Sequence, residues 1–151
     1  MKNYRGQGFT ISYPDNWQVS GDQDSVVLAP KGAVWSDPQS GSVQAYGVSI
    51  SRSQPSADSL DAETRQLLDS LERSNPTMRV TQQNHAIING HQAVETWFEN
   101  DSPIQGQREK DRLVTLESGG GLLTLIFIAP QSVFDSYQPA FEAMLRSLSV
   151  G

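Results

Sequence analysis

The feature that most constrains the fold is an apolar run in the last third of the chain. Between Leu122 and Ile128, every residue except Thr124 is hydrophobic. A strand with one wet face alternates apolar and polar residues, whereas a strand covered on both faces is apolar at nearly every position. We therefore expect this run in the interior of a sheet, shielded by helices on both sides or by helices on one side and a loop on the other.

Strand-like alternation recurs along most of the chain and supplies neighbours for this run. Phe9, Ile11 and Tyr13 alternate with polar residues, which is the period of a strand with one buried face. Pro14-Asp15-Asn16 has turn chemistry and predicts a hairpin between the first two strands, and Asn89-Gly90 is a strong hairpin signal. Strand-like segments cover residues 9–13, 17–19, 25–29, 46–53, 78–88, 91–99, 107–117 and 122–129.

Two segments have the period of amphipathic helices. In the first, leucines from Leu60 to Leu71 fall on one stripe, Asp58 or Ser59 can cap the start, and Asn75-Pro76 ends the helix. The second follows Pro130, with a cap at Asp135 or Ser136 and Pro139 in the first turn. Its apolar stripe consists of Tyr137, Phe141, Met144, Leu145 and Leu148.

These elements predict a single α+β domain over residues 1–151, without an internal repeat or a linker. The sheet is mainly antiparallel, with about six to seven strands and with helices packed on its faces. The chain has 151 residues, enough for one hydrophobic core without disulfide bridges. It contains no cysteine, which excludes disulfides, thiolate metal sites and cysteine nucleophiles.

The charge balance argues against two classes of partner. A net charge of −6 repels phosphate backbones, so we expect no nucleic acid as a partner. The same balance argues against a basic membrane-surface helix, and no apolar run is long enough to cross a bilayer, so we expect no membrane insertion by this domain.

Motifs that carry catalysis or bind a cofactor are missing from the sequence. It has no Gly-x-Ser-x-Gly elbow and no phosphate-binding or dinucleotide glycine fingerprint, and a hairpin turn accounts for Gly119-Gly120-Gly121. The two histidines, His85 and His91, flank the Asn89-Gly90 turn without a third metal ligand at a suitable spacing. We therefore expect no catalytic residue, cofactor or metal site in this domain.

Two stretches remain as candidates for binding. Residues 31–45 are rich in Gly, Ser and Asp and hold Trp35, and a long loop of this kind is often functional. The simpler interpretation, which we favour, is a surface loop whose Trp35 folds back onto the core. In residues 108–112, strand geometry sends three basic side chains to one face and Glu109 and Asp111 to the other, so neither face can be dry.

The charged stretch also has two interpretations. It is either a solvated strand end with cross-strand charge pairs or a polar cleft that recognises a ligand or partner through Glu109, Asp111 and Arg112. A further alternative is an enzyme with a new site beside Glu109 and Asp111. We favour the solvated strand end, and we keep Trp35, Glu109, Asp111 and Arg112 as candidate binding residues.

Several strand starts and turns resemble the PsbP-like fold. The resemblance lies in residues 8–17, in the helix end at Asn75-Pro76, in Ile88-Asn89-Gly90, in residues 127–130 and in the final helix. This fold is shared by the extrinsic photosystem II subunit, a small Ran-binding import factor and DcrB-like envelope lipoproteins. The resemblance implies an α/β/α sandwich and specifies the fold better than the activity.

A closer similarity is to C-terminal domains of bacterial HtpX/CAAX-protease-like zinc metallopeptidases. It rests on Tyr13 to Trp17, Asn100 to Pro103 and Asp111 to Thr115. The chain lacks the His-Glu-x-x-His helix, so proteolysis would belong to an upstream domain. The resemblance implies a non-catalytic accessory domain excised from a longer extracytoplasmic chain, where it positions substrate, a protein partner or the peptidase. The alternative is a free-standing ligand- or protein-binding module of the PsbP/DcrB type.

Overall fold

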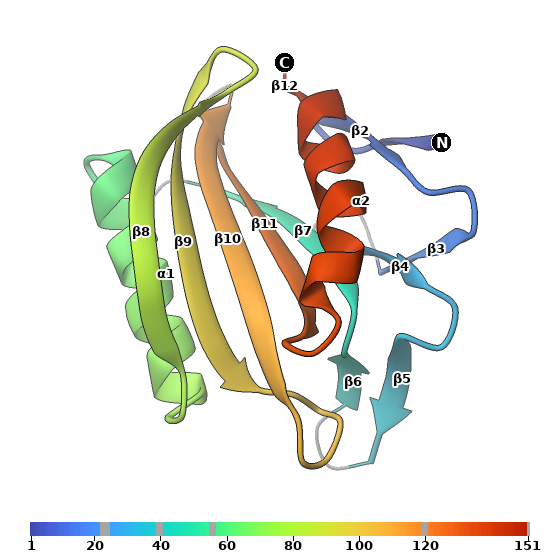
Figure 1. The fold of residues 1–151 in the computed structure, drawn as a ribbon. Coiled ribbons are helices and arrows are strands. Elements are labelled where there is room, and N and C mark those ends of the chain that lie inside the picture. The colour runs from blue at the N-terminus through green and yellow to red at the C-terminus, as the bar shows by residue number, and fades with distance from the viewer. Residues whose placement is uncertain (22–24, 39–40, 55–56, 119–120, 151) are drawn as a thin grey trace.

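A seven-stranded antiparallel sheet forms the body of the protein in a computed structural model that describes residues 1–21, 25–38, 41–54, 57–118 and 121–150 (Figure 1). The strand order is β3-β4-β7-β11-β10-β9-β8, and the antiparallel α+β fold is confirmed. The strands are β3 (Trp17–Gly21), β4 (Ser25–Pro30), β7 (Gly47–Ser53), β8 (Arg79–Ile88), β9 (His91–Asp101), β10 (Arg108–Ser118) and β11 (Gly121–Pro130). Residues 119–120 of the predicted glycine turn lie outside the described residues.

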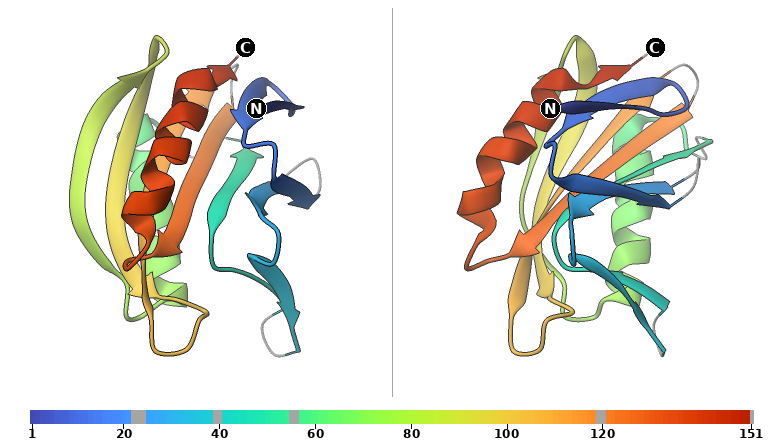
Figure 2. Two further views of the ribbon diagram at one scale, coloured as in Figure 1. Left: turned by 45° about the vertical axis from the view of Figure 1, so that its right-hand side comes forward. Right: turned by 90° about the vertical axis from the view of Figure 1, so that its right-hand side faces the viewer.

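The apolar run occupies the centre of this sheet, as its composition predicts. β11 is the middle strand of the seven. It pairs with β7 on one side and with β10 on the other, and each side has three strands in all. Its alternate residues Leu123, Leu125 and Phe127 are at most 1% exposed, and they face the same side of the sheet as Val48 and Ile50. Helices cover the two faces, α1 (Leu60–Ser74) on one side and α2 (Phe134–Ser147) on the other (Figure 2).

Helix α1 begins and ends where local chemistry predicts. The Ser59 side chain accepts a hydrogen bond from the backbone N–H of Ala62, and Asn75 caps the C-terminal end. The leucine stripe packs on β9 and β10, where Leu68 contacts Phe98 and Leu113. This cluster is small, so α1 covers part of its sheet face.

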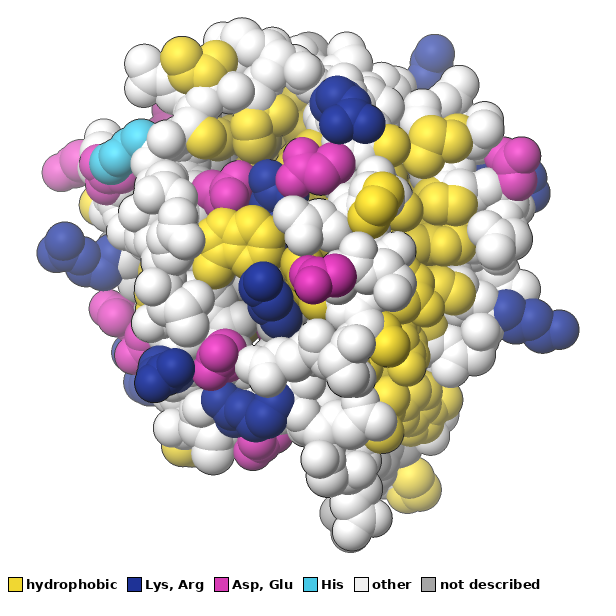
Figure 3. Space-filling model, in the orientation of Figure 1, with side chains coloured by type: hydrophobic (Ala, Val, Ile, Leu, Met, Phe, Trp, Pro, Cys, Tyr) yellow, Lys and Arg dark blue, Asp and Glu magenta, His cyan; other side chains and the backbone are white. Residues whose placement is uncertain are grey.

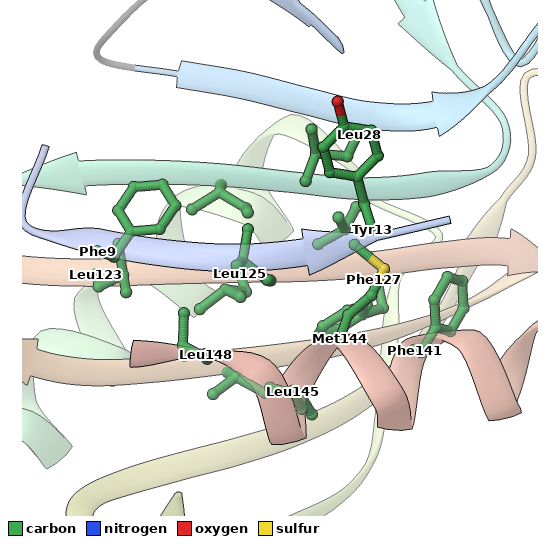
Figure 4. Packing of buried hydrophobic residues seen from close by; sticks show 14 of the residues in the cluster. Phe9, Tyr13, Leu28, Leu123, Leu125, Phe127, Phe141, Met144, Leu145 and Leu148 are labelled. Atoms are coloured by element: carbon green, nitrogen blue, oxygen red, sulfur yellow. The ribbon is translucent and has the colours of Figure 1, made fainter. Parts of the chain in front are cut away.

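The opposite face has a larger cover that combines α2 with a second, three-stranded sheet. That sheet has the order β1-β2-β12, from β1 (Lys2–Arg5), β2 (Phe9–Tyr13) and β12 (Ser149–Val150). Side chains from β2, β11 and α2 meet in one core, shown in Figure 4. Helix α2 starts at Phe134 with Val133 as its N-cap, so Pro139 lies inside the helix and the predicted caps Asp135 and Ser136 are wrong.

The predicted hairpin between the first two strands is also wrong. β2 pairs with β1 and β12, whereas β3 pairs with β4 in the large sheet. The turn after Pro14 is present, with the backbone N–H of Trp17 donating to the Pro14 carbonyl over 3.0 Å. The chain changes sheets there, because Phe9, Ile11 and Tyr13 bury their side chains against α2 and the large sheet.

Part of the predicted loop over residues 31–45 is a hairpin. β5 (Val34–Asp37) pairs with β6 (Gly41–Gln44) in a separate two-stranded sheet, which projects from the end of the molecule (Figure 1). Residues 39–40 lie outside the described residues. Trp35 pairs across the hairpin with Val43 and is 38% exposed, so it does not fold back onto the core. Strand pairing satisfies the backbone of this segment and holds Trp35 away from the core.

The turn between β8 and β9 ties the large sheet to the C-terminal end of α2. Asn89 has a φ of 50° and is followed by Gly90 in the left-handed region, as the turn requires. The Asn89 side-chain amide donates to the carbonyls of Leu145 at 3.1 Å and Leu148 at 2.6 Å. It therefore adds a second hydrogen bond to the Leu145 carbonyl, which also accepts from the Leu148 N–H, and it pairs with the carbonyl of Leu148 just beyond the helix.

Substitution of Asn89 separates its two roles. We expect N89G to reduce the free energy of unfolding by about 1–2 kcal/mol, because glycine tolerates the φ but cannot donate to the helix carbonyls. N89A loses the same bonds and adds about 1 kcal/mol of left-handed strain. Urea unfolding measures both values. Equal stability of N89G and the parent protein would show that the contact with α2 contributes nothing.

Candidate functional site

β10 distributes the predicted charged residues over two faces of the large sheet. The hydroxyl of Thr115 on β10 contacts that of Thr64 on α1 at 2.7 Å, so the odd-numbered residues of β10 face α1. Glu109 and Asp111 therefore lie on the α1 face, and Arg112 lies on the α2 face. The strand thus separates residues that the sequence grouped as one possible cleft.

Glu109 and Asp111 form a buried carboxyl pair joined by a side-chain hydrogen bond. They are 6% and 3% exposed. Burial raises the pKa of Asp111 well above its ordinary value, and the hydrogen bond and negative charge of Glu109 raise it further. Burial also raises the pKa of Glu109, although its hydrogen bond with Asp111 and the charge of Arg108 oppose the shift. Both shifts favour the protonated form of the pair relative to an exposed carboxyl.

This burial corrects part of the prediction that neither face of residues 108–112 can be dry. The face with Glu109 and Asp111 is dry, whereas the Arg108 side chain on the other face is 36% exposed and makes a cross-strand charge pair with Asp101. Arg112 is 8% exposed, so both faces of the strand exclude water at residues 111 and 112. Among the described residues, Oδ1 of Asp111 is buried without a hydrogen-bond partner. A carboxyl pair this deeply buried offers little surface to a substrate, which disfavours an enzyme site beside Glu109 and Asp111.

Arg112 is the centre of a charged cluster between β9, β10 and α2. Its guanidinium pairs with Glu95 at 2.9 Å and with Glu142 on α2, and the indole N–H of Trp97 donates to Glu95 at 2.8 Å. Removing one partner of a buried ion pair costs about 3–5 kcal/mol, because the remaining charge stays buried. Nε of Arg112 is buried without a hydrogen-bond partner among the described residues, whereas its other two nitrogens pair with Glu95 and Glu142, and we interpret the cluster as structural.

Lys110 lies beside this cluster and has aromatic neighbours. Its Nζ is 5.0 Å from the ring centre of Trp97 and 5.0 Å from that of Phe134, which are distances of cation–π contacts. On the side of the molecule that carries α2, acidic and basic side chains surround a hydrophobic patch (Figure 3). The mixed signs make this surface unsuited to a strongly charged ligand.

A trough lies between α1 and β8, and sequence reasoning did not predict it. One part, of about 680 Å³, is lined by Ser59, Leu60 and Asp61 at the start of α1 and by His85, Ala86, Ile87, Gln92 and Ala93 of the β8–β9 hairpin. A second part, of about 380 Å³, lies between α1 and β8 and is lined by Asp61, Arg65, Leu68, Asp69, Glu72, Gln83 and His85. The parts share Asp61 and His85.

A contact between a helix and a strand crosses the trough. Nε2 of His85 lies 2.7 Å from Oδ1 of Asp61. The register of β8 with β9 places His85 on the α1 face and His91 on the α2 face, so the histidines do not meet. Among the described residues, no group of three or more His, Cys, Asp or Glu side chains is arranged to hold a metal ion. Within the same residues, no helix has the length and apolarity needed to cross a membrane.

Sequence comparison does not place the chain in a family, whereas structural comparison identifies its fold. No known protein-family profile matches the chain, and no curated protein is significantly similar to it. The solution structure of cyanobacterial PsbP from Synechocystis sp. PCC 6803 is similar with a TM-score of 0.69 and 11% identity, over 99% of this chain and 92% of that one. The fold is therefore PsbP-like, as the strand starts and turns indicated.

Two other solved structures share this fold at low identity. LpqN of Mycobacterium tuberculosis, described as involved in cell envelope biogenesis, matches with a TM-score of 0.62 and 14% identity, over 94% of this chain and 82% of that one. A variant of Mog1 matches with a TM-score of 0.63 and 9% identity, over 99% of this chain and 96% of that one. None of these similarities connects the chain to a metallopeptidase.

The carboxyl pair predicts an inverse dependence of stability on pH. The folded-state pKa of Asp111 lies above its unfolded value of about 3.9, so its contribution to stability is complete below that value and is lost as pH rises through the folded pKa. We expect D111N to be more stable than the parent protein at pH 8 and to lose this advantage near pH 4.

Asp101 supplies a matched control of opposite sign. It is exposed, and a hydrogen bond from Arg108 lowers its pKa, so its contribution to stability is present above the unfolded pKa and is lost as pH falls. D101N is therefore expected to bring no gain at pH 8. Urea unfolding of both variants from pH 4 to pH 8 checks the difference. A D111N variant less stable than the parent protein at pH 8 would contradict the raised pKa of Asp111.

Proposed function

We propose that this domain is a non-catalytic binding module that positions a protein partner. The observation that carries the proposal is the trough between α1 and β8, which is open, partly apolar and bordered by an exposed strand. Ligand sites are typically concave and combine apolar surface with placed polar groups; here the apolar surface lies at the end lined by Leu60 and Ile87, and the rest of the trough is mostly polar. The titratable pair with raised pKa values lies elsewhere and is buried.

The fold supports a binding role without specifying the partner. A fold hosts many functions, so the activity has to be argued from the site. The similarity to LpqN, which is described as involved in cell envelope biogenesis, favours a location outside the cytoplasm. We therefore propose that the domain works outside the cytoplasm. We do not propose nucleic acid as a partner, because the net charge of −6 repels phosphate backbones.

A second contact surface in this proposal is the β5–β6 hairpin. Trp35 is exposed on a paired strand that projects from the main body, and aromatic residues are enriched at the centres of protein interfaces. Arg112, Glu109 and Asp111 are assigned to the interior and not to the partner surface, because each is more than nine-tenths buried.

We further propose that this domain is part of a longer protein. The resemblance of residues 13–17, 100–103 and 111–115 to metallopeptidase C-terminal domains supports an accessory role in a zinc metallopeptidase. In that setting the domain holds the protein substrate while the upstream domain cleaves it. Binding that is equal in the ground state and the transition state lowers KM without raising kcat.

The reading frame upstream of the Tyr4 codon is the first test. If it encodes a His-Glu-x-x-His segment, we expect deletion of this domain to raise the KM for a protein substrate about tenfold and to change kcat by less than about twofold. A comparable loss in kcat would show that the domain takes part in the chemistry. A stop codon close upstream would contradict the accessory role and leave the free-standing module.

The isolated domain provides the control for catalysis. It is assayed with peptide, ester and phosphoester substrates, and we expect no turnover above background. Turnover that is abolished by E109Q or D111N in a folded protein would overturn the non-catalytic proposal and establish an enzyme site at the carboxyl pair.

A further inference from the structure

β8 is an edge strand with unusual exposure. It ends the large sheet, pairs with β9 on one side only, and spans ten residues. Seven successive residues from its start are exposed, and Ile87 near its end is 74% exposed. An edge strand presents unpaired N–H and C=O groups that can pair with another extended chain. A β-bulge between Val80 and Gln82 and the charge of Arg79 protect only its first part.

On the sheet face that α1 covers, the helix leaves open space next to β8. The helix packs on β9 and β10, and the trough lies between its flank and β8. The left view of Figure 2 shows β8 at the outer edge of the sheet, bowed away from α1. A strand added to the outer edge of β8 would direct alternate side chains toward this space, because strand side chains alternate between the two faces.

The chemistry of the trough changes along its length. Leu60 and Ile87 line the end near the β8–β9 turn, so that end suits an apolar side chain. The other end contains Asp69 and Glu72 together with Arg65, and Asp61 lies between the two parts. Acidic groups therefore outnumber basic ones where the trough continues along the helix.

We propose that an extended, basic peptide segment of a partner protein adds to the free edge of β8 and places its side chains in the trough. Ile87 and Gln83 are four residues apart on the same face and line the apolar and the acidic part. A strand rises about 3.3 Å per residue, so these positions are about 13 Å apart. The ligand therefore carries an apolar residue and, four positions away, a Lys or Arg.

Charge distinguishes this occupant from a second copy of the chain. Antiparallel pairing of two β8 strands about a twofold axis normal to the sheet would keep both α1 helices on one face. Asp61, Asp69 and Glu72 of both copies would then border the same interface. Like charges oppose that arrangement, as does the net charge of −6, whereas a basic peptide complements both.

This inference rests on the proposed binding function and is tested by fluorescence anisotropy with a defined probe. The probe is a labelled, blocked peptide of alternating Thr and Val with Leu at one position and Lys four positions later. We expect saturable binding that weakens with salt, and about tenfold weaker binding to I87S. The matched control is V19S, which removes an exposed apolar side chain from the opposite edge strand and leaves binding unchanged.

Three further measurements identify the binding mode. A peptide with Glu in place of Lys is expected to bind about tenfold more weakly and to regain affinity with D69K. Of two peptides N-methylated on alternate amides, one loses binding and the other keeps it, because only alternate amides of a paired strand face its neighbour. Unchanged binding to I87S, or equal effects of the two methylations, overturns the proposal.

The remaining outcomes separate this inference from the proposed function. NMR shifts induced by the peptide at Trp35 instead of β8 overturn the trough as the site and leave the binding function in place. Absence of binding by the folded protein overturns the peptide proposal alone. If the protein sediments as a dimer and I87S sediments as a monomer, the occupant of the β8 edge is a second copy of the chain, and the peptide proposal is overturned.

Discussion

The apolar composition of β11 is the constraint on which the rest of the structure depends, because a strand without a polar face has to be kept from water on both sides. Helix α2 and the sheet β1-β2-β12 cover one side, while α1 covers part of the other. The second cover is narrower and centred on β9 and β10. The exposed edge at β8 and the trough beside it are therefore consequences of how the central strands are protected.

β10, next to β11, determines where charge can lie in this arrangement. Its alternation places Glu109 and Asp111 on the α1 side and Arg112 on the α2 side, where Arg112 pairs with Glu95. All three groups lie in the interior and offer little surface to a partner. The binding function is consequently left to surfaces that the interior does not use, namely the β8 edge and the β5–β6 hairpin.

The sequence predicts those parts of the fold that depend on local chemistry. The cap at Ser59, the turn at Asn89-Gly90 and the apolar run in β11 each carry their signal within a few residues. The choice of β1 and β12 as neighbours of β2 depends on side-chain burial between distant segments, which no local pattern encodes. The trough is equally non-local, since Asp61 and His85 are 24 positions apart. The polar composition of β8 was a readable signal of an edge strand.

Amide hydrogen exchange along β8 in the free protein tests the central claim most directly, because the account requires an edge that is folded and unoccupied. Inward-facing amides bonded to β9 should exchange slowly, and the interleaved outward-facing amides should exchange at nearly the rate of an unstructured chain. Uniform protection of both sets would show that the outer edge is already covered and would contradict the account. Uniform rapid exchange of both sets would show that β8 is not a stable strand, and this result would also contradict the account.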